Sequence, residues 1–311
     1  MKKEVEKLLQ YVQKPARYIG GELNAVVKDK DKIDIRYAFC FPDTYEIGMS
    51  HLGMKILYGL VNNREDSWCE RVFAPDNDME EQLRKNNVPL FALESGDYIK
   101  DFDMIGFTLQ YELSYTNVLN MLNLAQIPLK SSDRENLTPL ICVGGPCACN
   151  PEPITDFVDI VFLGDGEETT NRVIDLLIDC KKKGISKKEF LLKAKDITGI
   201  YVPSFYEDSY NEDGTLKELK PLYGAPEKVK KAVVSDMNKV FYPKEFVVPY
   251  INIVHDRAVE EIFRGCIRGC RFCQAGFIYR PIREKSVETI NKQSKALIDS
   301  TGYDELSLCS L

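Results

Sequence analysis

Residues 33–41 have the sequence IDIRYAFCF, and residues 52–61 have the sequence LGMKILYGLV. The first stretch is an apolar run typical of a strand, and the second shows the apolar spacing of a helix. A strand, a loop and a helix in this order form the unit from which parallel α/β sheets are built. The residues therefore predict an α/β fold that begins at Ile33.

The same pattern of strand, loop and helix recurs through to residue 196. Further strands are predicted around 71–73 and at 104–108, 139–145 and 160–164, and further helices at 79–85, 115–124 and 167–180. This alternation predicts a doubly wound parallel sheet over residues 33–196. Loops at the carboxyl ends of such strands bind ligands, so we expect a binding face in the loops at 42–50, 109–114, 144–153 and 164–167.

The segments outside this sheet have different patterns. Residues 1–32 predict a helical appendage with an amphipathic helix and a turn at Gly20 and Gly21. Residues 197–248 predict a hairpin, turning at 212–215, and a connector. Residues 249–311 predict a lead-in strand at 251–254, a buried strand at 258–263, a helix at 287–300 and a strand at 304–308.

The composition excludes several classes of protein. The formal charge of −7 over 311 residues does not indicate nucleic-acid binding, which needs a basic face. No apolar run approaches the ~20 residues of a membrane span, and the first residues lack a secretory signal, so we expect a cytoplasmic protein. In that compartment the ten cysteines are expected to be reduced thiols, metal ligands or core residues.

Three of these cysteines form the strongest chemical motif. Cys266, Cys270 and Cys273 have the spacing CxxxCxxC, amid the basic residues Arg264, Arg268, Arg271, Arg280 and Arg283. A structural zinc site usually draws four ligands, and a bacterial ferredoxin motif has another spacing and a fourth cysteine. Three thiolates on one loop suit a four-iron cluster whose fourth iron stays open to a small ligand, and open positions mark catalytic sites.

The motif resembles the signature of the radical S-adenosylmethionine superfamily, in which an aromatic residue, here Phe272, precedes the third cysteine. The resemblance implies that Cys266, Cys270 and Cys273 ligate a 4Fe-4S cluster. It also implies that the free iron binds S-adenosylmethionine and that the backbone near Phe272 contacts adenine. Reductive cleavage to a 5'-deoxyadenosyl radical would then need an electron donor such as a flavodoxin or ferredoxin.

The stretch from Ile262 to Arg283 resembles a subfamily that fuses a cobalamin-binding-like domain to the radical domain. Upstream elements agree, namely SHLG at 50–53, GGP at 144–146, PEP at 151–153 and GDGE at 164–167. The resemblance implies that Gly144 and Gly145 accommodate the cobalamin tail. The DxHxxG motif of histidine-ligated cobalamin is absent, because no aspartate precedes His51 by two residues, so His51 is interpreted as a packed or capping residue and cobalamin is left open.

The radical domain of this superfamily is usually an α/β barrel, and residues 249–311 supply only its first units, since a complete eightfold barrel needs ~250 residues. The chain is therefore expected to be an incomplete part of the enzyme and inactive alone, and no catalytic residue or substrate follows from it. Two alternatives stay open, a non-catalytic iron–sulfur electron-transfer protein and a zinc-binding module. Of the other cysteines, Cys40, Cys142 and Cys180 are expected in the core, Cys147 and Cys149 as small loop residues, and Cys69 and Cys309 are unassigned.

Overall fold

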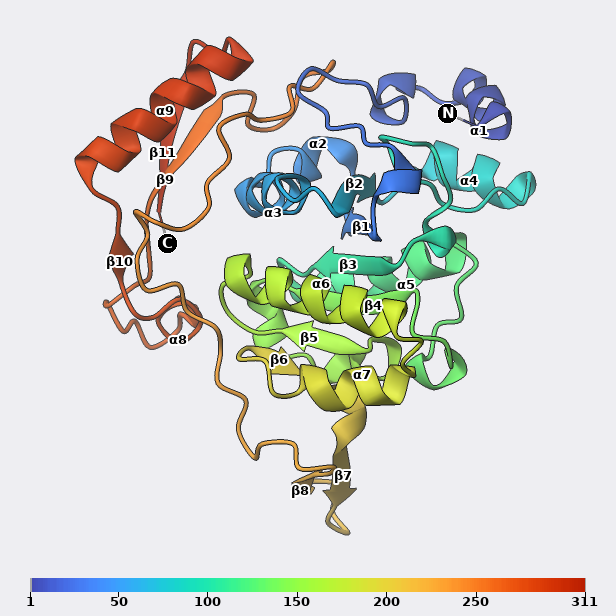
Figure 1. Cartoon of the computed structure of the whole chain (residues 1–311), viewed down its shortest axis with the longest axis vertical. Coiled ribbons are helices and arrows are strands. Elements are labelled where there is room, and N and C mark those ends of the chain that lie inside the picture. The colour runs from blue at the N-terminus through green and yellow to red at the C-terminus, as the bar shows by residue number, and fades with distance from the viewer. Residues whose placement is uncertain (1, 311) are drawn as a thin grey trace.

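A six-stranded sheet forms the centre of the computed structural model, which describes residues 2–310 (Figure 1). The strands lie in the order β2-β1-β3-β4-β5-β6. Their bounds are β1 (Ile35–Phe41), β2 (Ser67–Phe73), β3 (Met104–Thr108), β4 (Leu140–Gly144), β5 (Ile160–Phe162) and β6 (Ile200–Tyr201). Strands β1 to β5 pair in parallel, and β6 pairs antiparallel with β5. The predicted parallel sheet is confirmed, with an added antiparallel edge strand.

Helices cover both faces of this sheet, as a doubly wound fold requires. One face packs against α1 (Lys3–Leu8), α4 (Asn77–Lys85) and α5 (Tyr115–Leu124), and the other against α3 (Leu52–Asn62), α6 (Glu167–Lys182) and α7 (Lys187–Ala194). The alternation of β1 explains the two cores, because Ala38 and Cys40 enter the first and Tyr37 and Phe39 the second. A short helix, α2 (Tyr45–Gly48), precedes α3.

Residues 202–257 connect the sheet to the C-terminal part. They contain the predicted hairpin, β7 (Tyr206–Tyr210) and β8 (Leu216–Pro221), which projects from the sheet at the bottom of Figure 1. The predicted strand at 251–254 is wrong. Ile253 is buried, and both it and Ile251 pack on the second core instead of pairing with a strand. The apolar residues there signalled burial, not strand pairing.

The C-terminal part, which we call the cysteine unit, comprises residues 258–310. Its three strands are β9 (Ala258–Arg264), β10 (Arg283–Glu284) and β11 (Leu306–Ser310), in the order β10-β9-β11. Strands β9 and β11 are parallel and are connected through α9 (Val287–Thr301), the arrangement expected at the start of an α/β barrel. Strand β10 is antiparallel to β9, and α8 (Ala275–Ile278) lies between them in sequence.

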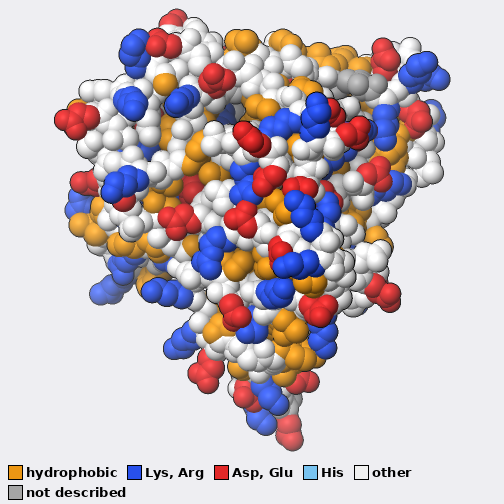
Figure 2. Space-filling view, in the orientation of Figure 1, with side chains coloured by type: hydrophobic (Ala, Val, Ile, Leu, Met, Phe, Trp, Pro, Cys, Tyr) orange, Lys and Arg blue, Asp and Glu red, His pale blue; other side chains and the backbone are white. Residues whose placement is uncertain are grey.

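The surface mixes charges of both signs. Figure 2 shows Lys and Arg side chains interspersed with Asp and Glu over the face that it presents. Such a face lacks the continuous basic area that phosphate binding requires. Within residues 2–310, no helix is both long and apolar enough to cross a membrane.

Candidate functional site

A cavity of about 530 Å³ lies between the sheet and the cysteine unit. Its floor consists of the carboxyl ends of β1, β3, β4 and β5 and the loops that follow them, and its opposite wall includes residues of β9 and β11. The strand order reverses between β1 and β3, and such reversal points are where doubly wound sheets open a crevice for ligands. The loops predicted to form a binding face therefore do meet at one edge.

Glycines give the cavity its room at the end of β4. A Cβ atom added to Gly144 would lie 3.4 Å from Cβ of Phe162, an ordinary contact, so a longer side chain would extend into the cavity. Gly145 has φ +95°, and its added Cβ would lie 2.7 Å from the Leu109 carbonyl oxygen. The backbone thus requires glycine at Gly145, whereas Gly144 could carry a Cβ and as glycine leaves that space open. Both line the cavity, and their role in cofactor binding stays a prediction.

His51 presents the main titratable ring at the cavity floor. Its Nδ1 accepts the Met54 backbone N–H at 3.1 Å and so caps α3, which agrees with the capping role expected from the sequence. Burial lowers the pKa of His51 to about 4, so the ring is neutral at physiological pH. Because Nδ1 accepts, we assign the proton to Nε2, which makes the ring a hydrogen-bond donor.

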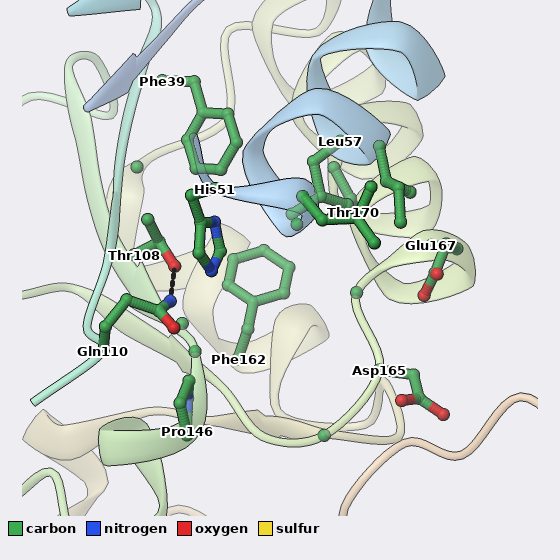
Figure 3. A pocket seen from close by; sticks show the side chains of 18 of the residues that line it. Phe39, His51, Leu57, Thr108, Gln110, Pro146, Phe162, Asp165, Glu167 and Thr170 are labelled. Atoms are coloured by element: carbon green, nitrogen blue, oxygen red, sulfur yellow. Dashed lines mark hydrogen bonds between the residues drawn. The ribbon is translucent and has the colours of Figure 1, made fainter. Parts of the chain in front are cut away.

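Two polar residues at the end of β3 and in the loop after it accompany this ring. Gln110 Nε2 donates to Thr108 Oγ1 at 2.7 Å, and Figure 3 shows Gln110, His51 and Phe162 pointing into the same space. The remaining lining is largely aliphatic and aromatic, including Phe39 and Leu57. An apolar cavity with a few convergent polar groups is the usual form of a small-molecule or cofactor site. Thr108 ends the strand predicted at 104–108, Gln110 lies in the loop predicted at 109–114, and Phe162 lies within the strand predicted at 160–164. None of the three was singled out individually from the sequence.

The three motif cysteines lie in the loop at residues 265–282, which we call the cysteine loop. Cys266 and Cys273 are half-buried, Cys270 is exposed, and Phe272 is 94% exposed. Gly269 adopts φ +66°, consistent with the expected tight turn between the first two cysteines. The donor set suits an iron–sulfur cluster chemically, yet over the described residues 2–310 no three His, Cys, Asp or Glu side chains are arranged as a metal site. The ligand assignment stays a prediction.

The cysteines outside the cysteine loop are either buried or exposed. Cys40, Cys142 and Cys180 are buried, as predicted, and so is Cys69, which had no assignment. Cys147 is buried and Cys149 exposed in the loop after β4. Cys309 lines the cavity from β11, a position that sequence patterning gave no means of identifying.

Comparison with known proteins gives both sequence and structural relatives. Residues 53–203 match the family model for the N-terminal region of radical SAM proteins. An uncharacterized protein of Methanocaldococcus jannaschii is 26% identical over 263 residues, which cover 81% of this chain and 44% of the relative. The chain thus spans less than half the length of this curated relative.

Two solved structures of the radical S-adenosylmethionine methyltransferase TsrM from Kitasatospora setae resemble the fold. Both are 10% identical and cover 88% of this chain and 47% of TsrM, with TM-scores of 0.50 and 0.49. The first has cobalamin and a 4Fe-4S cluster bound, and the second a tryptophan substrate and an S-adenosylmethionine analogue. Over residues 53–203 the chain thus matches the N-terminal region of radical SAM proteins, in agreement with the resemblance that its sequence predicted.

Proposed function

We propose that this protein is a radical S-adenosylmethionine enzyme in which the cavity binds cobalamin and the cysteine loop binds a 4Fe-4S cluster. The observation that carries the proposal is the cavity of about 530 Å³, which is open at the β1/β3 reversal and bounded by the strand that leads into the cysteine loop. The cavity and the loop thus share β9. The match of residues 53–203 to radical SAM proteins supports an enzyme, and the similarity of the fold to TsrM supports a cobalamin-linked methyl transfer.

Each part of the chain has a stated role in this proposal. Cys266, Cys270 and Cys273 would hold the cluster, and the backbone near Phe272 would contact the adenine of S-adenosylmethionine. When bound, the cluster supplies the electron for cleavage of S-adenosylmethionine, and cobalamin supplies methyl transfer chemistry. Apolar lining residues such as Phe39 and Leu57 would displace water from the cavity when the cofactor is bound.

His51 would serve cobalamin as a hydrogen-bond donor, not as a cobalt ligand. Its Nδ1 lone pair accepts the Met54 N–H, and the proton on Nε2 leaves the ring without a free lone pair toward the cavity. The absence of the DxHxxG motif also argues against His51 as a cobalt ligand. The residues therefore fit cobalamin held by shape and hydrogen bonds, with Gly144 providing space beside Phe162.

The cluster is tested by anaerobic reconstitution with iron and sulfide, followed by electron paramagnetic resonance with and without S-adenosylmethionine. We expect about four irons per chain and a spectrum that S-adenosylmethionine alters, because the ligand would occupy the open iron. Cys270→Ala is expected to lose most of the iron and the response. Cys149→Ala, at an exposed cysteine outside the cysteine loop, is the matched control and should retain both.

The outcomes separate the proposal from its alternatives. Bound zinc with no iron signal would make the cysteine loop a zinc-binding module. Iron that does not respond to S-adenosylmethionine would instead indicate an electron-transfer protein. Cobalamin is tested separately by titrating the protein with hydroxocobalamin and following the visible spectrum. No spectral change at saturating concentration would remove cobalamin from the proposal and leave the radical class intact.

A further inference from the structure

One carboxylate of the sheet domain binds both ends of the cysteine loop. Arg264 ends β9 and Arg283 begins β10, and the two are paired in the antiparallel register, so together they close the base of residues 265–282. Arg264 Nη1 lies 3.2 Å from Asp165 Oδ1, and Arg283 Nη1 binds Asp165 Oδ2. Asp165 itself belongs to the loop after β5 and lines the cavity (Figure 3).

Two further carboxylates bind Arg264 at this junction. Glu167 Oε1 lies 2.5 Å from Arg264 Nη2, and Glu261 Oε1 lies 2.8 Å from Arg264 Nε. These side chains are at most 14% exposed. Salt and water screen such pairs weakly, and removal of one partner leaves a buried charge uncompensated. The junction is therefore an energetically important contact between the sheet domain and the cysteine unit.

Contacts other than the two arginines also hold the backbone around Asp165 in place. Its N–H donates to the Ala232 carbonyl at 3.0 Å, and its Oδ2 accepts the Val234 N–H at 2.7 Å. Gly164 has φ +94°, and an added Cβ would lie 2.1 Å from the Ala232 oxygen, so only glycine permits this close approach. From the same connector, Lys231 Nζ donates to the Ile278 carbonyl at 2.6 Å, at the end of α8 inside the cysteine loop.

We propose that Asp165 is a positioning residue that holds the cysteine loop in register with the cavity through Arg264 and Arg283. The functional significance of this contact rests on the proposed function. A cysteine loop held in this position would orient the cluster toward the cofactor in the cavity. The contact itself is made by side chains of this chain alone. Asp165 reacts with nothing and acts through the two arginines.

The contact is tested by hydrogen exchange on the intact chain without cofactors. Asp165→Asn keeps an oxygen for the Val234 N–H and removes the charge that joins the two arginines. We expect amides of residues 265–282 to exchange at least roughly tenfold faster, with β3 unchanged. Glu168→Gln is the matched control, because Glu168 is an exposed neighbour on α6, and its exchange should equal that of wild type. Unchanged exchange in the loop would overturn the proposal.

A second variant and a spectrum distinguish positioning from general stability. Arg283→Gln removes one of the two cations and is expected to speed amide exchange in the same residues, 265–282. If Asp165→Asn does not fold, this variant provides the test of the proposal. Faster exchange in β3 as well would mean only general destabilisation. In reconstituted protein, Asp165→Asn should broaden the spectrum of the reduced cluster at equal iron content, and an identical spectrum would also contradict positioning. If the wild type binds no cluster, the proposed function fails while the exchange result still stands.

Discussion

At the scale of single residues, His51 gives a prediction about pH. Its folded pKa is about 4, below the ordinary value of 6.5, because burial disfavours the charged ring. Between these two values the unfolded chain takes up a proton that the folded chain does not. The wild type should therefore lose roughly 2 to 3 kcal/mol of unfolding free energy, relative to His51→Asn, as the pH falls from 7 to 4.

Denaturant unfolding at several pH values measures this difference. Asparagine is a suitable replacement, because its side chain can still accept the Met54 N–H and cap α3. His255→Asn is the matched control at an exposed histidine and should follow the wild-type curve. Parallel curves for wild type and His51→Asn would show that the ring titrates equally in the folded and unfolded states, against the burial argument.

At the scale of elements, apolar runs in the sequence were sufficient to predict the buried strands. Short polar strands, which lack such runs, were predicted poorly. The run at 104–108 became β3, and the helix at 115–124 became α5, with identical bounds. Strand β10 was missed because Arg283 and Glu284 carry no apolar signal and pair only through the tertiary contact with β9. Helix α7 was also missed. Its first turn has a capping box formed by Ser186 and Glu189, and the Ser-x-x-Glu sequence pattern of such a box could have predicted the start of the helix.

The candidate site also has features that local sequence predicts and features that depend on the tertiary structure. Local spacing is enough to identify the three cysteines, the turn at Gly269 and the glycines at the end of β4. The network around Asp165 joins residues about a hundred positions apart, Arg264 and Asp165 among them, and no local pattern encodes it. Likewise, the side of β11 that faces the cavity became apparent only once β9 and β11 had paired.

The end of β4 offers an element-scale test of the cavity as a cobalamin site. Gly144→Leu would extend a side chain into the cavity without the strain that Gly145 would suffer. We expect the dissociation constant for hydroxocobalamin to rise at least roughly tenfold, because the ligand would have to displace packed apolar atoms. Gly144→Ala, which adds only the tolerated Cβ, should change it by less than about threefold. Equal affinity in all three proteins would place cobalamin outside this cavity.

At the scale of the whole molecule, the segment before β1 ties the sheet to the C-terminal part. Residues 1–32 were expected as a helical appendage, and within them Glu22 forms a buried ion pair with Arg71 of β2, 2.7 Å apart. Glu94 binds the same guanidinium at 2.6 Å. Two residues after Glu22, the Asn24 amide donates to the carbonyls of Phe246 and Ser300, each at 3.0 Å. The segment therefore contacts the sheet, the connector and α9 together.

Removing the Glu22 charge should therefore destabilise more than one part of the molecule. Glu22→Gln would leave Arg71 with a single buried carboxylate, and the expected loss of unfolding free energy is about 3 kcal/mol. Glu80→Gln removes an exposed pair with Arg84 on α4 and should cost no more than about 0.5 kcal/mol. Denaturant unfolding compares the two variants, and hydrogen exchange should show α9 loosened only in Glu22→Gln. Equal losses in both would mean that the buried charge is solvated and that the segment does not join the two parts.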